Sequence, residues 1–404
     1  MSSRFLFVEE VDVAARTVLL RLDINVPITN GVINDKTRLN RVLPGIEALR
    51  AAGASIVILT HFGRPNGRVV PEFSVVPLAS ALAAQLGCEV PVEPSIIGES
   101  LQVAAHLGPG DVLMLENLRF HPGEEANDPD FAAALARLGD IYVGDAFSCA
   151  HRAHASVEAL PRLMVAAGKT VCAGQSMGAE LAALNAALSV PKRPVVAVVG
   201  GAKVSTKLQI LENLMTRVDY IVLGGGMANT FLLAMGHNVG ASLVEADMVN
   251  KASCIMKMAT ANDCRLVLPR DAVVARKYSA DALHRVSDIE TIGSDEMILD
   301  FGPQSIVAVT EIIKACKTIV WNGPIGAFEI APFDMGTNAI AQAVAARTVT
   351  GDILSVAGGG DTIAALVNAG SSDQFSYLST GGGAFLEWLE GKTLPGVKAL
   401  QITV

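Results

Sequence analysis

Short apolar runs alternate with alanine- and leucine-rich segments along almost the whole chain, and this alternation limits the possible folds most strongly. Strand-length runs of Val, Ile and Leu suit parallel strands that are buried on both faces, and the segments between them suit helices. We expect strands at 17–23, 55–60, 111–116, 140–144, 194–200, 220–224, 264–268, 318–321, 353–357 and 375–379. The clearest expected helices are 44–52, 77–86, 129–138 and 205–215. This repetition predicts an α/β protein with parallel sheets.

The length of the chain divides this pattern between two lobes. A chain of 404 residues is longer than a single hydrophobic core usually supports. The alanine-rich segment 177–188 has few strand formers and is followed by Pro191 and Pro194, which would end a helix. We predict two lobes, each a parallel β-sheet with helices on both faces in a Rossmann-like three-layer arrangement, joined by an interlobe helix. The expected parts are an N-terminal lobe 1–173, a hinge helix 174–190, a C-terminal lobe 191–390 and a tail 391–404 that either packs back on the N-terminal lobe or frays.

Composition excludes several classes of protein. Hydrophobic residues make up 51% of the chain, yet no apolar run approaches the roughly 18 residues that a membrane-spanning helix needs. The acidic residues Glu9, Glu10 and Asp12 come too early for a secretion signal. Six scattered cysteines without a C-x-x-C pair predict neither disulfides nor a zinc site, and they favour a reducing cytoplasm. A net charge of −9 argues against nucleic-acid binding, so neither a nucleic acid nor a membrane is expected as a partner.

Basic side chains follow the expected strands of the first half. Ligands of open α/β sheets bind beyond the carboxyl ends of the strands. The residues near these ends are Asp23, Asn25, His61, Phe62, Gly63, Arg64, Arg119, His151, Arg152 and His154. A lone arginine is usually a surface ion pair, but several at successive strand ends predict a preformed site for a small anion. Arg38 is weaker evidence by itself, because it follows a turn where it could be solvated, and Asp23 could merely orient a neighbouring arginine.

Glycine-rich stretches follow the expected strands of the second half. They are Gly200–Gly201, Gly224–Gly226, Gly358–Gly360 and Gly381–Gly383. A backbone without side chains lets amide N–H groups approach phosphates. Lys203 and Lys207 are four residues apart and would share one face near a helix start, where the helix dipole disfavours cations unless an anion binds there. A solvated lysine pair is the alternative.

Asp361 has two compatible interpretations. It could cap the helix that follows Gly358–Gly360, and it could also hold a magnesium ion carried in on a nucleotide. Neither a P-loop nor a G-x-G-x-x-G fingerprint is present, since Gly224–Gly226 is followed by Met, Ala and Asn. The nucleotide hypothesis therefore depends on glycine at several strand ends.

In order and spacing, these motifs resemble the phosphoglycerate kinase family along almost the whole chain. The segments that carry the resemblance are 21–27, 61–65, 116–120, 145–147, 150–154, 200–207, 224–231, 321–324, 328–329, 358–362 and 379–383. The resemblance implies a monomeric, cytoplasmic enzyme that reversibly transfers the acyl phosphate of 1,3-bisphosphoglycerate to Mg-ADP, giving 3-phosphoglycerate and ATP, as in glycolysis and gluconeogenesis. It also implies lobe closure and in-line transfer without a covalent intermediate.

The family pattern also implies a role for each matching residue. Binding of the triose in the N-terminal lobe is expected from Asp23, Asn25, Arg38, His61, Phe62, Gly63, Arg64, Arg119, His151, Arg152 and His154. Binding of the nucleotide is expected from Lys203, Lys207, Gly225, Gly226, Asn322, Pro324, Glu329, Gly358, Gly359, Gly360, Asp361 and Thr362, with Asp361 holding Mg²⁺ through the nucleotide. The residues expected to act on the transferred phosphoryl group are Arg38, Lys203, Gly359 and Gly382.

Some positions depart from the family pattern. Ser148 and Cys149 stand where Gly-Thr is common, and Thr60 and Phe62 replace Ser and Leu beside His61. The segment 175–179 lacks the usual Glu-Lys pair, which puts the hinge packing in question and leaves the chemistry intact.

Two other classes share parts of the pattern. A dinucleotide-dependent dehydrogenase would also be an α/β protein, but the missing fingerprint counts against it. A two-lobed solute-binding protein would share the hinge and the anion pocket but would carry out no chemistry. An ATP-formation assay with 1,3-bisphosphoglycerate and Mg-ADP distinguishes all three.

Overall fold

The computed structural model describes residues 3–29 and 32–403. It divides into two compact units: unit 1 comprises Met1–Leu181 with Thr393–Val404, and unit 2 comprises Ala182–Lys392. Each unit has its own six-stranded sheet in which all neighbouring strands are parallel, and this confirms the predicted fold. The division falls inside helix α7 (Gln175–Leu184), which a short π-helical segment, Asn185–Ser189, extends.

The sheet of unit 1 has β2 at its centre, with β5 on one side and β8 on the other. In spatial order its strands are β6 (Val92–Glu93), β7 (Val112–Leu115), β5 (Ser55–Leu59), β2 (Thr17–Leu22), β8 (Ile141–Asp145) and β9 (Thr170–Ala173). The helices of this unit are α1 (Thr37–Ala51), α2 (Val76–Leu86), α3 (Ser100–Ala105), α4 (Pro122–Glu125), α5 (Pro129–Ala136), α6 (Leu160–Ala166) and α15 (Pro395–Ala399). The predicted strands of the first half are confirmed, whereas β6 and β9 were not predicted.

Helix α1 begins at Thr37, so the prediction of a helix starting at Pro44 was wrong. The Asp35 carboxylate accepts a hydrogen bond from the Thr37 amide at 2.8 Å and so supports the first turn. The buried residues of α1, Leu39, Val42, Ile46 and Leu49, follow the spacing of one helical face and join the core of the sheet. Packing of this apolar stripe stabilises the helix although it contains Pro44, which lies on the exposed side. Arg38 therefore lies in the first turn of a helix.

In the sheet of unit 2, the first strand in the sequence, β10, lies beside the fourth, β16. In spatial order its strands are β12 (Arg265–Val267), β11 (Tyr220–Leu223), β10 (Val195–Val199), β16 (Thr318–Asn322), β17 (Leu354–Gly358) and β18 (Tyr377–Ser379). Its helices are α8 (Leu208–Leu214), α9 (Gly225–Ala234), α10 (Val249–Ala261), α11 (Pro303–Ala315), α12 (Met335–Val349), α13 (Gly360–Asn368) and α14 (Gly383–Leu389). Every residue of β10 and β16 is buried, as expected for central parallel strands.

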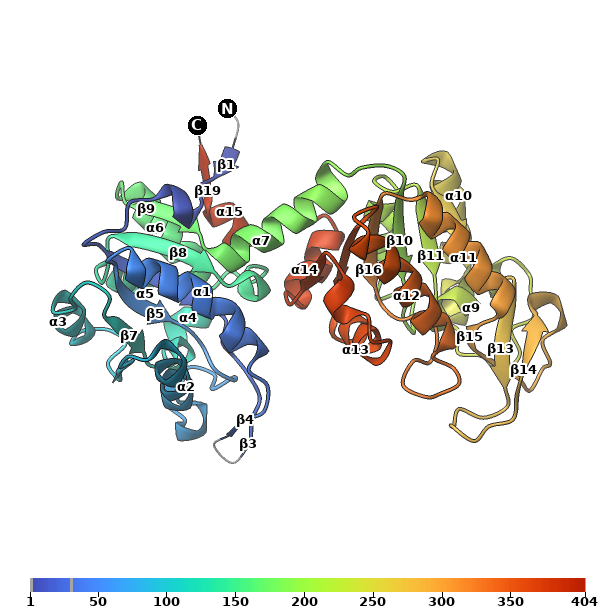
Figure 1. The fold of residues 1–404 in the computed structure, drawn as a ribbon, viewed down its shortest axis with the longest axis horizontal. Helices are drawn as coiled ribbons and strands as arrows, with labels where there is room; N and C mark the ends of the chain where they lie inside the picture. The colour runs from blue at the N-terminus through green and yellow to red at the C-terminus, as the bar shows by residue number, and fades with distance from the viewer. Residues whose placement is uncertain (1–2, 30–31, 404) are drawn as a thin grey trace. The chain divides into compact units, whose positions relative to one another are not determined.

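Three smaller sheets within the described residues were not predicted. Unit 2 also contains an antiparallel sheet of β13 (Asp271–Ala275), β14 (His284–Asp288) and β15 (Met297–Phe301). Strand β3 (Ile28–Thr29) pairs antiparallel with β4 (Val32–Ile33). Strand β1 (Ser3–Phe5) pairs with β19 (Gln401–Thr403), so the two ends of the described chain lie side by side (Figure 1).

The C-terminal segment is built into unit 1. The Gly396 amide donates to the Ala150 carbonyl at 2.9 Å, and Val397 and Leu400 are buried. Within residues 3–29 and 32–403, no helix is long and apolar enough to cross a membrane.

Candidate active sites

Most of the site residues predicted for unit 1 lie at the carboxyl edge of its sheet. After β2 the chain moves to β5 on one side, and it later returns to β8 on the other, so the strand order reverses at β2 and β8. Such a reversal is where ligands of open α/β sheets bind. The predicted residues at this edge are Asp23 and Asn25 after β2, His61 to Arg64 after β5, Arg119 in the turn after β7, and His151, Arg152 and His154 after β8. The sheet thus brings together residues that are far apart in the sequence.

Asp23 and Arg38 form an ion pair. Arg38 Nη1 donates to Asp23 Oδ2 at 2.8 Å and to the Asn25 carbonyl at 3.1 Å, so the possibility that Arg38 is freely solvated was wrong. Asp23 also accepts from the Asn25 amide at 3.1 Å and from the Ser148 hydroxyl. The Asn25 side chain in turn accepts from the Gly63 amide at 3.2 Å. These contacts fix the loops after β2 and β5 relative to each other.

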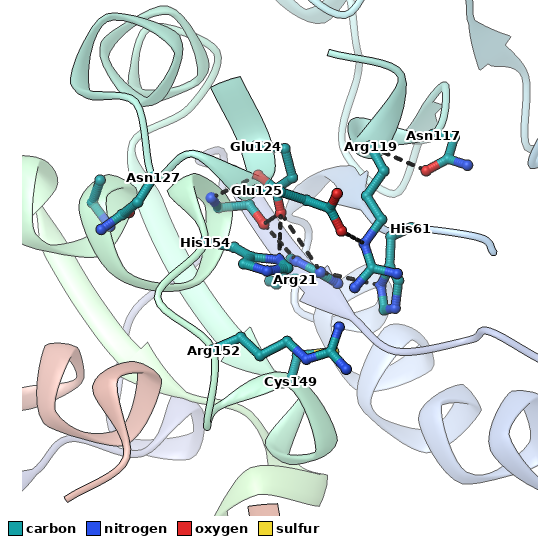
Figure 2. Close-up of polar contacts among 12 residues, drawn as sticks. Arg21, His61, Asn117, Arg119, Glu124, Glu125, Asn127, Cys149, Arg152 and His154 are labelled. Carbon is teal, nitrogen blue, oxygen red and sulfur yellow. Dashed lines mark hydrogen bonds and ion pairs between the residues drawn. The ribbon is translucent and has the colours of Figure 1, made fainter. Parts of the chain in front are cut away.

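A buried cluster of polar and charged groups, which we call the Arg21 cluster, was not predicted (Figure 2). It consists of Arg21, Glu124 and Ser156. Arg21 Nε donates to Ser156 Oγ at 2.8 Å, and that hydroxyl donates to Glu124 Oε1 at 2.6 Å. The Ser156 amide donates to Glu124 Oε2 at 2.9 Å, and Arg21 Nη2 lies 3.9 Å from Glu124 Oε1. Both charged side chains are almost wholly inaccessible to solvent. A buried charge needs such partners, because transfer from water is costly.

Arg21 also determines the tautomer of His61. Its Nη2 lies 3.2 Å from His61 Nδ1, and a guanidinium group can only donate hydrogen bonds. His61 Nδ1 must therefore accept, which leaves the ring proton on Nε2. Burial, followed by the charges of Arg21 and Arg119, lowers the pKa of His61 well below its ordinary value. His61 is thus a neutral N–H donor at neutral pH.

The same surroundings keep His154 neutral. Burial, then the charges of Arg119 and Arg21, lowers the pKa of His154 to about 3. An unfolded histidine takes up its proton near pH 6.5. Between these two values the unfolded chain binds more protons than the folded chain, so stability is lost as the pH falls below about 6.5.

We therefore expect His154→Asn to make the stability of the protein less sensitive to acid. Removing one such proton should reduce the slope of the unfolding free energy against pH by up to about 1.4 kcal/mol per pH unit between pH 4 and 6. Chemical unfolding at a series of pH values measures this slope, and the exposed His106→Asn is the control. Asp145, whose pKa burial raises to about 6, acts in the opposite direction but is common to both proteins. An unchanged slope in His154→Asn contradicts the prediction.

Arg119 is held against the loop after β5. Its Nη1 donates to the Gly63 carbonyl at 2.7 Å, its Nε lies 3.3 Å from Glu125 Oε1, and the side chain is buried. Asn117 fixes the same turn, because its side-chain amide donates to the Phe62 carbonyl at 2.6 Å and its side-chain oxygen accepts from the Arg119 amide at 3.1 Å. Figure 2 shows Arg119 and Arg152 gathered with His61 around the strand ends.

The remaining predicted residues of this edge differ in burial. Arg152 and His151 are half-buried, and Arg152 Nε donates to His151 Nε2 at 3.3 Å. Arg64 is exposed. Cys149, one of the positions that depart from the family pattern, is buried, and this burial raises the pKa of its thiol to about 11. The thiol is therefore protonated at neutral pH.

A cavity of about 670 Å³ lies in unit 2 where β10 and β16, the strands at its order reversal, end side by side. The predicted residues that line it are Lys207, Gly225, Gly226, Asn322, Pro324, Glu329, Gly359, Gly360, Asp361 and Thr362. Two glycines let the loops after the strands touch: a Cβ on Gly200 would clash with the Pro324 carbonyl, and one on Gly323 would clash with the Gly200 carbonyl. Within the described part of the chain, Lys203, Gly358 and Gly382 are outside this lining. Gly382 instead precedes α14, with a positive φ of 51°.

Lys203 and Lys207 do not share a helix face, so that prediction was wrong. Helix α8 begins at Leu208, and the Lys207 amide donates to the Val204 carbonyl at 2.9 Å to close a turn before it. Lys207 has a non-helical φ of −117°. Its ammonium group donates to the Asn322 side-chain oxygen, and the amide nitrogen of Asn322 donates to the Gly358 carbonyl at 2.7 Å. Lys203 is exposed on the preceding loop.

Asp361 is not the cap of α13. Gly359, with a φ of 102°, precedes the first helical residue, Gly360, and a side chain on Gly359 would press against Asn322. Asp361 therefore lies in the first turn with its exposed carboxylate beside the cavity, where an acidic group suits the helix dipole. Thr362 is buried, and its hydroxyl accepts from the Gly323 amide at 2.7 Å. The turn thus fastens β16 to α13.

Part of the cavity lining is apolar, and we call this part the apolar end. It includes Leu243, Ile298 and Phe328, and a Cβ on Gly226 would meet Leu243 Cδ2 at 3.0 Å. Tyr278, also a lining residue, donates its hydroxyl to Glu329 Oε2 at 3.4 Å. Tyr278, Ile298 and Leu243 could not be predicted from sequence patterns. Tyr278 and Ile298 come from the antiparallel sheet region, which gave no sequence signal, and Leu243 comes from the loop after α9.

Comparisons with known proteins agree along the whole chain. The family model described as phosphoglycerate kinase matches residues 8–392. The phosphoglycerate kinase of Rhodospirillum centenum is 54% identical over 397 residues, covering 98% of this chain and 99% of the relative. That of Ruegeria sp. is 54% identical over 394 residues, covering 97% and 98%.

Solved structures give the same result. The structure of phosphoglycerate kinase from Coxiella burnetii has a TM-score of 0.92 and 42% identity, covering 98% of this chain and 99% of that one. The crystal structure of the Pyrococcus horikoshii enzyme has a TM-score of 0.78 and 30% identity, covering 97% and 98%. With a six-stranded parallel sheet in each unit, an arginine- and histidine-rich edge in one and a glycine-walled cavity in the other, the chain belongs to the phosphoglycerate kinase family.

Proposed function

We propose that this phosphotransferase, a phosphoglycerate kinase by family, carries its phosphoglycerate substrate on unit 1 and its adenine nucleotide on unit 2. One observation carries the proposal: each unit has a chemically distinct group of side chains or a cavity at the reversal of its own strand order. The site of unit 1 is rich in guanidinium groups, which bind carboxylate and phosphate groups bidentately. The cavity of unit 2 combines an apolar end with glycine loops, which suits a base and a chain of phosphates.

In unit 1, the triose would lie against the basic groups at the sheet edge. The Nε2–H of His61 supplies a neutral donor, because Arg21 occupies its other nitrogen. The proposed binding residues are Asp23, Asn25, Arg38, His61, Phe62, Gly63, Arg64, Arg119, His151, Arg152 and His154. The Asp23–Arg38 ion pair orients the arginine whose charge the transferred phosphoryl group would need.

In unit 2, the base would occupy the apolar end near Gly225 and Gly226, with Glu329 facing the ribose hydroxyls. The phosphates would extend toward Lys207 and the N-terminus of α13, where helix amides and the positive end of the dipole favour anions. The other proposed nucleotide-binding residues are Lys203, Asn322, Pro324, Gly358, Gly359, Gly360, Asp361 and Thr362.

The carboxylate of Asp361 fits a magnesium ion that arrives with the nucleotide. It is exposed, lines the cavity and lies close enough to Lys207 to interact with its charge. Mg²⁺ prefers one or two carboxylates together with phosphate oxygens. When bound, the ion would supply charge shielding for the nucleotide phosphates.

The reaction itself needs no proton shuttle. The attacking phosphate oxygen of ADP and the departing carboxylate are both ionised, so positioning and charge neutralisation remain. We assign that neutralisation to Arg38, Lys203 and the backbone amides near Gly359 and Gly382. Because the reactants are carried by different units, transfer requires a closing motion that aligns them and excludes water. We keep the prediction of a monomeric, cytoplasmic enzyme.

Asp361→Ala tests the assignment of one ligand to each unit. The variant should bind Mg-ADP much more weakly and retain its affinity for 3-phosphoglycerate, because the carboxylate lies only at the cavity of unit 2. Calorimetry with each ligand separately measures this, and ATP formation from 1,3-bisphosphoglycerate and Mg-ADP reports activity. Arg119→Ala is the reciprocal variant and should lose the triose and keep the nucleotide. Loss of both ligands in either variant contradicts the assignment.

A further inference from the structure

A short segment of unit 2, residues 242–245, connects three parts of the nucleotide cavity, and we call it the strap. Its Ser242 hydroxyl accepts from the Ile298 amide at 2.9 Å, and Ile298 is in the cavity wall. The Leu243 carbonyl accepts from the Asn229 side chain of α9 at 3.2 Å. The Glu245 amide donates to Thr230 Oγ1, also of α9, at 3.1 Å. The strap is thus fixed to the cavity wall and to the helix beside it.

The carboxylate of Glu245 reaches from the strap to the lysine loop, residues 201–207. Its Oε2 accepts from the Ser205 amide at 3.0 Å, and its Oε1 accepts from the Ser205 hydroxyl at 2.5 Å. Ser205 is the midpoint between Lys203 and Lys207. The Thr206 hydroxyl donates to the Lys203 carbonyl at 3.0 Å within the same turn. Both oxygens of one carboxylate therefore hold the turn on which the two lysines lie.

The lysine loop has few other supports on its exposed side. Val204 is fully buried and the Met227 amide donates to the Gly201 carbonyl at 2.9 Å, so the start and the inner face of the loop are fixed. Lys203, Ser205 and Thr206 are exposed. The contact from Glu245 lies on this exposed side.

We infer that Glu245 is a positioning residue for phosphoryl transfer, which holds the lysine loop so that Lys203 presents its ammonium group to the nucleotide phosphates. The inference depends on the proposed function, because it takes Lys203 as the group that neutralises the moving phosphoryl. Leu243 of the same strap lines the apolar end of the cavity and is 57% exposed there. A base that covers Leu243 would order the strap, and the strap would order the lysine loop.

The charge of Glu245 is maintained at the pH at which such an enzyme works. Partial burial acts to raise its pKa, but the hydrogen bonds from Ser205 and the charge of Lys203 outweigh it and hold the pKa below the ordinary value. The carboxylate therefore remains ionised at neutral pH. Hydrogen bonds to an ionised acceptor are about twice as strong as neutral ones, which suits a contact at an exposed position.

Kinetics of Glu245→Ala alone and in a Lys203→Ala background test the inference. Glu245→Ala should lower kcat about tenfold, since displacement of a catalytic group by about 1 Å can cost up to about 100-fold. Its KM for 3-phosphoglycerate should not change. In the Lys203→Ala background the same substitution should have almost no further effect on kcat, because the group that it positions is gone. Glu245→Gln, which can still accept from Ser205, should restore most of the activity.

The control is Glu212→Ala, which removes a glutamate of α8. Its Oε1 lies 2.9 Å from Lys251 Nζ, and this ion pair involves no residue of the lysine loop. This variant should leave kcat at the wild-type value. If Glu245→Ala lowers kcat by the same factor in the wild-type and Lys203→Ala backgrounds, Glu245 has a general structural role and the inference is overturned. A wild-type kcat in Glu245→Ala also overturns it. If Lys203→Ala is inactive while Glu245→Ala is normal, only the strap is rejected and the proposed function stands. A fully active Lys203→Ala rejects the proposed role of Lys203 and the inference with it.

Discussion

Arg38→Ala is expected to lower kcat by about 10³-fold or more while weakening triose binding far less. Arginines that neutralise the transferred phosphoryl group are worth roughly this factor in related chemistry. The structure adds a reason for the position: Nη1 of Arg38 is held by Asp23 Oδ2 at 2.8 Å and by the Asn25 carbonyl at 3.1 Å. The side chain nevertheless keeps 36% of its surface exposed, so it is oriented without being enclosed. Steady-state kinetics in both directions and calorimetry with 3-phosphoglycerate separate the two effects.

The matched control is Arg16→Ala, which removes an exposed arginine of the same unit at the amino end of β2, the opposite end from Asp23. Its kcat should equal that of the wild type. Arg38→Lys keeps the charge but loses the planar fork, and should recover only part of the lost rate. A turnover of Arg38→Ala within tenfold of the wild-type value removes Arg38 from the mechanism.

Glu124→Ala is expected to destabilise unit 1 severely. The substitution leaves the guanidinium group of Arg21 buried without its acidic partner and removes both acceptors of Ser156. Breaking a buried ion pair from one side costs about 3–5 kcal/mol. For a unit of this size, the midpoint of thermal unfolding should fall on the order of 10 °C. Calorimetric scans, in which the two units can unfold separately, measure the loss.

The adjacent Glu125 provides the control. Its side chain is 37% exposed and pairs with Arg119, whereas Glu124 is fully buried. Glu125→Ala should therefore change the unfolding free energy by about 1 kcal/mol or less. Similar losses of unfolding free energy in Glu124→Ala and Glu125→Ala would show that the buried ion pair of Arg21 contributes no more to stability than an exposed one.

The parallel sheets were predictable because their strands are buried on both faces and give uninterrupted apolar runs. β10 and β16, for example, are buried at every position, and both were predicted within a residue or two. β14 gave no such signal, since four of its five residues are exposed and the segment reads as polar loop. β6 has only two residues, too few for any periodicity. Strands supported by one face or by very few residues are therefore the ones that sequence patterns miss.

For the site residues, too, sequence patterns predicted some features and missed others. Asp23 and Arg119 could be placed at one edge of the sheet because they follow strands that run in the same direction, whereas Asn322 was implied only by the family resemblance. The partnership of Arg21 with Glu124 could not, because the two are far apart in the sequence and only the folded sheet brings them together. The start of α8 was placed too early because Val204 and Lys207 close a turn before the helix begins. The gathering of polar side chains at the strand ends could be predicted, but the local geometry that orients them could not.

The pairing of β1 with β19 and the packing of α15 onto unit 1 have a consequence for synthesis on the ribosome. Unit 1 is made of both ends of the polypeptide, whereas unit 2 is one continuous stretch. All of unit 2 is therefore synthesised before the segment that completes unit 1. Unit 1 needs this late segment, which carries α15 and β19, whereas unit 2 needs no residue made after Lys392.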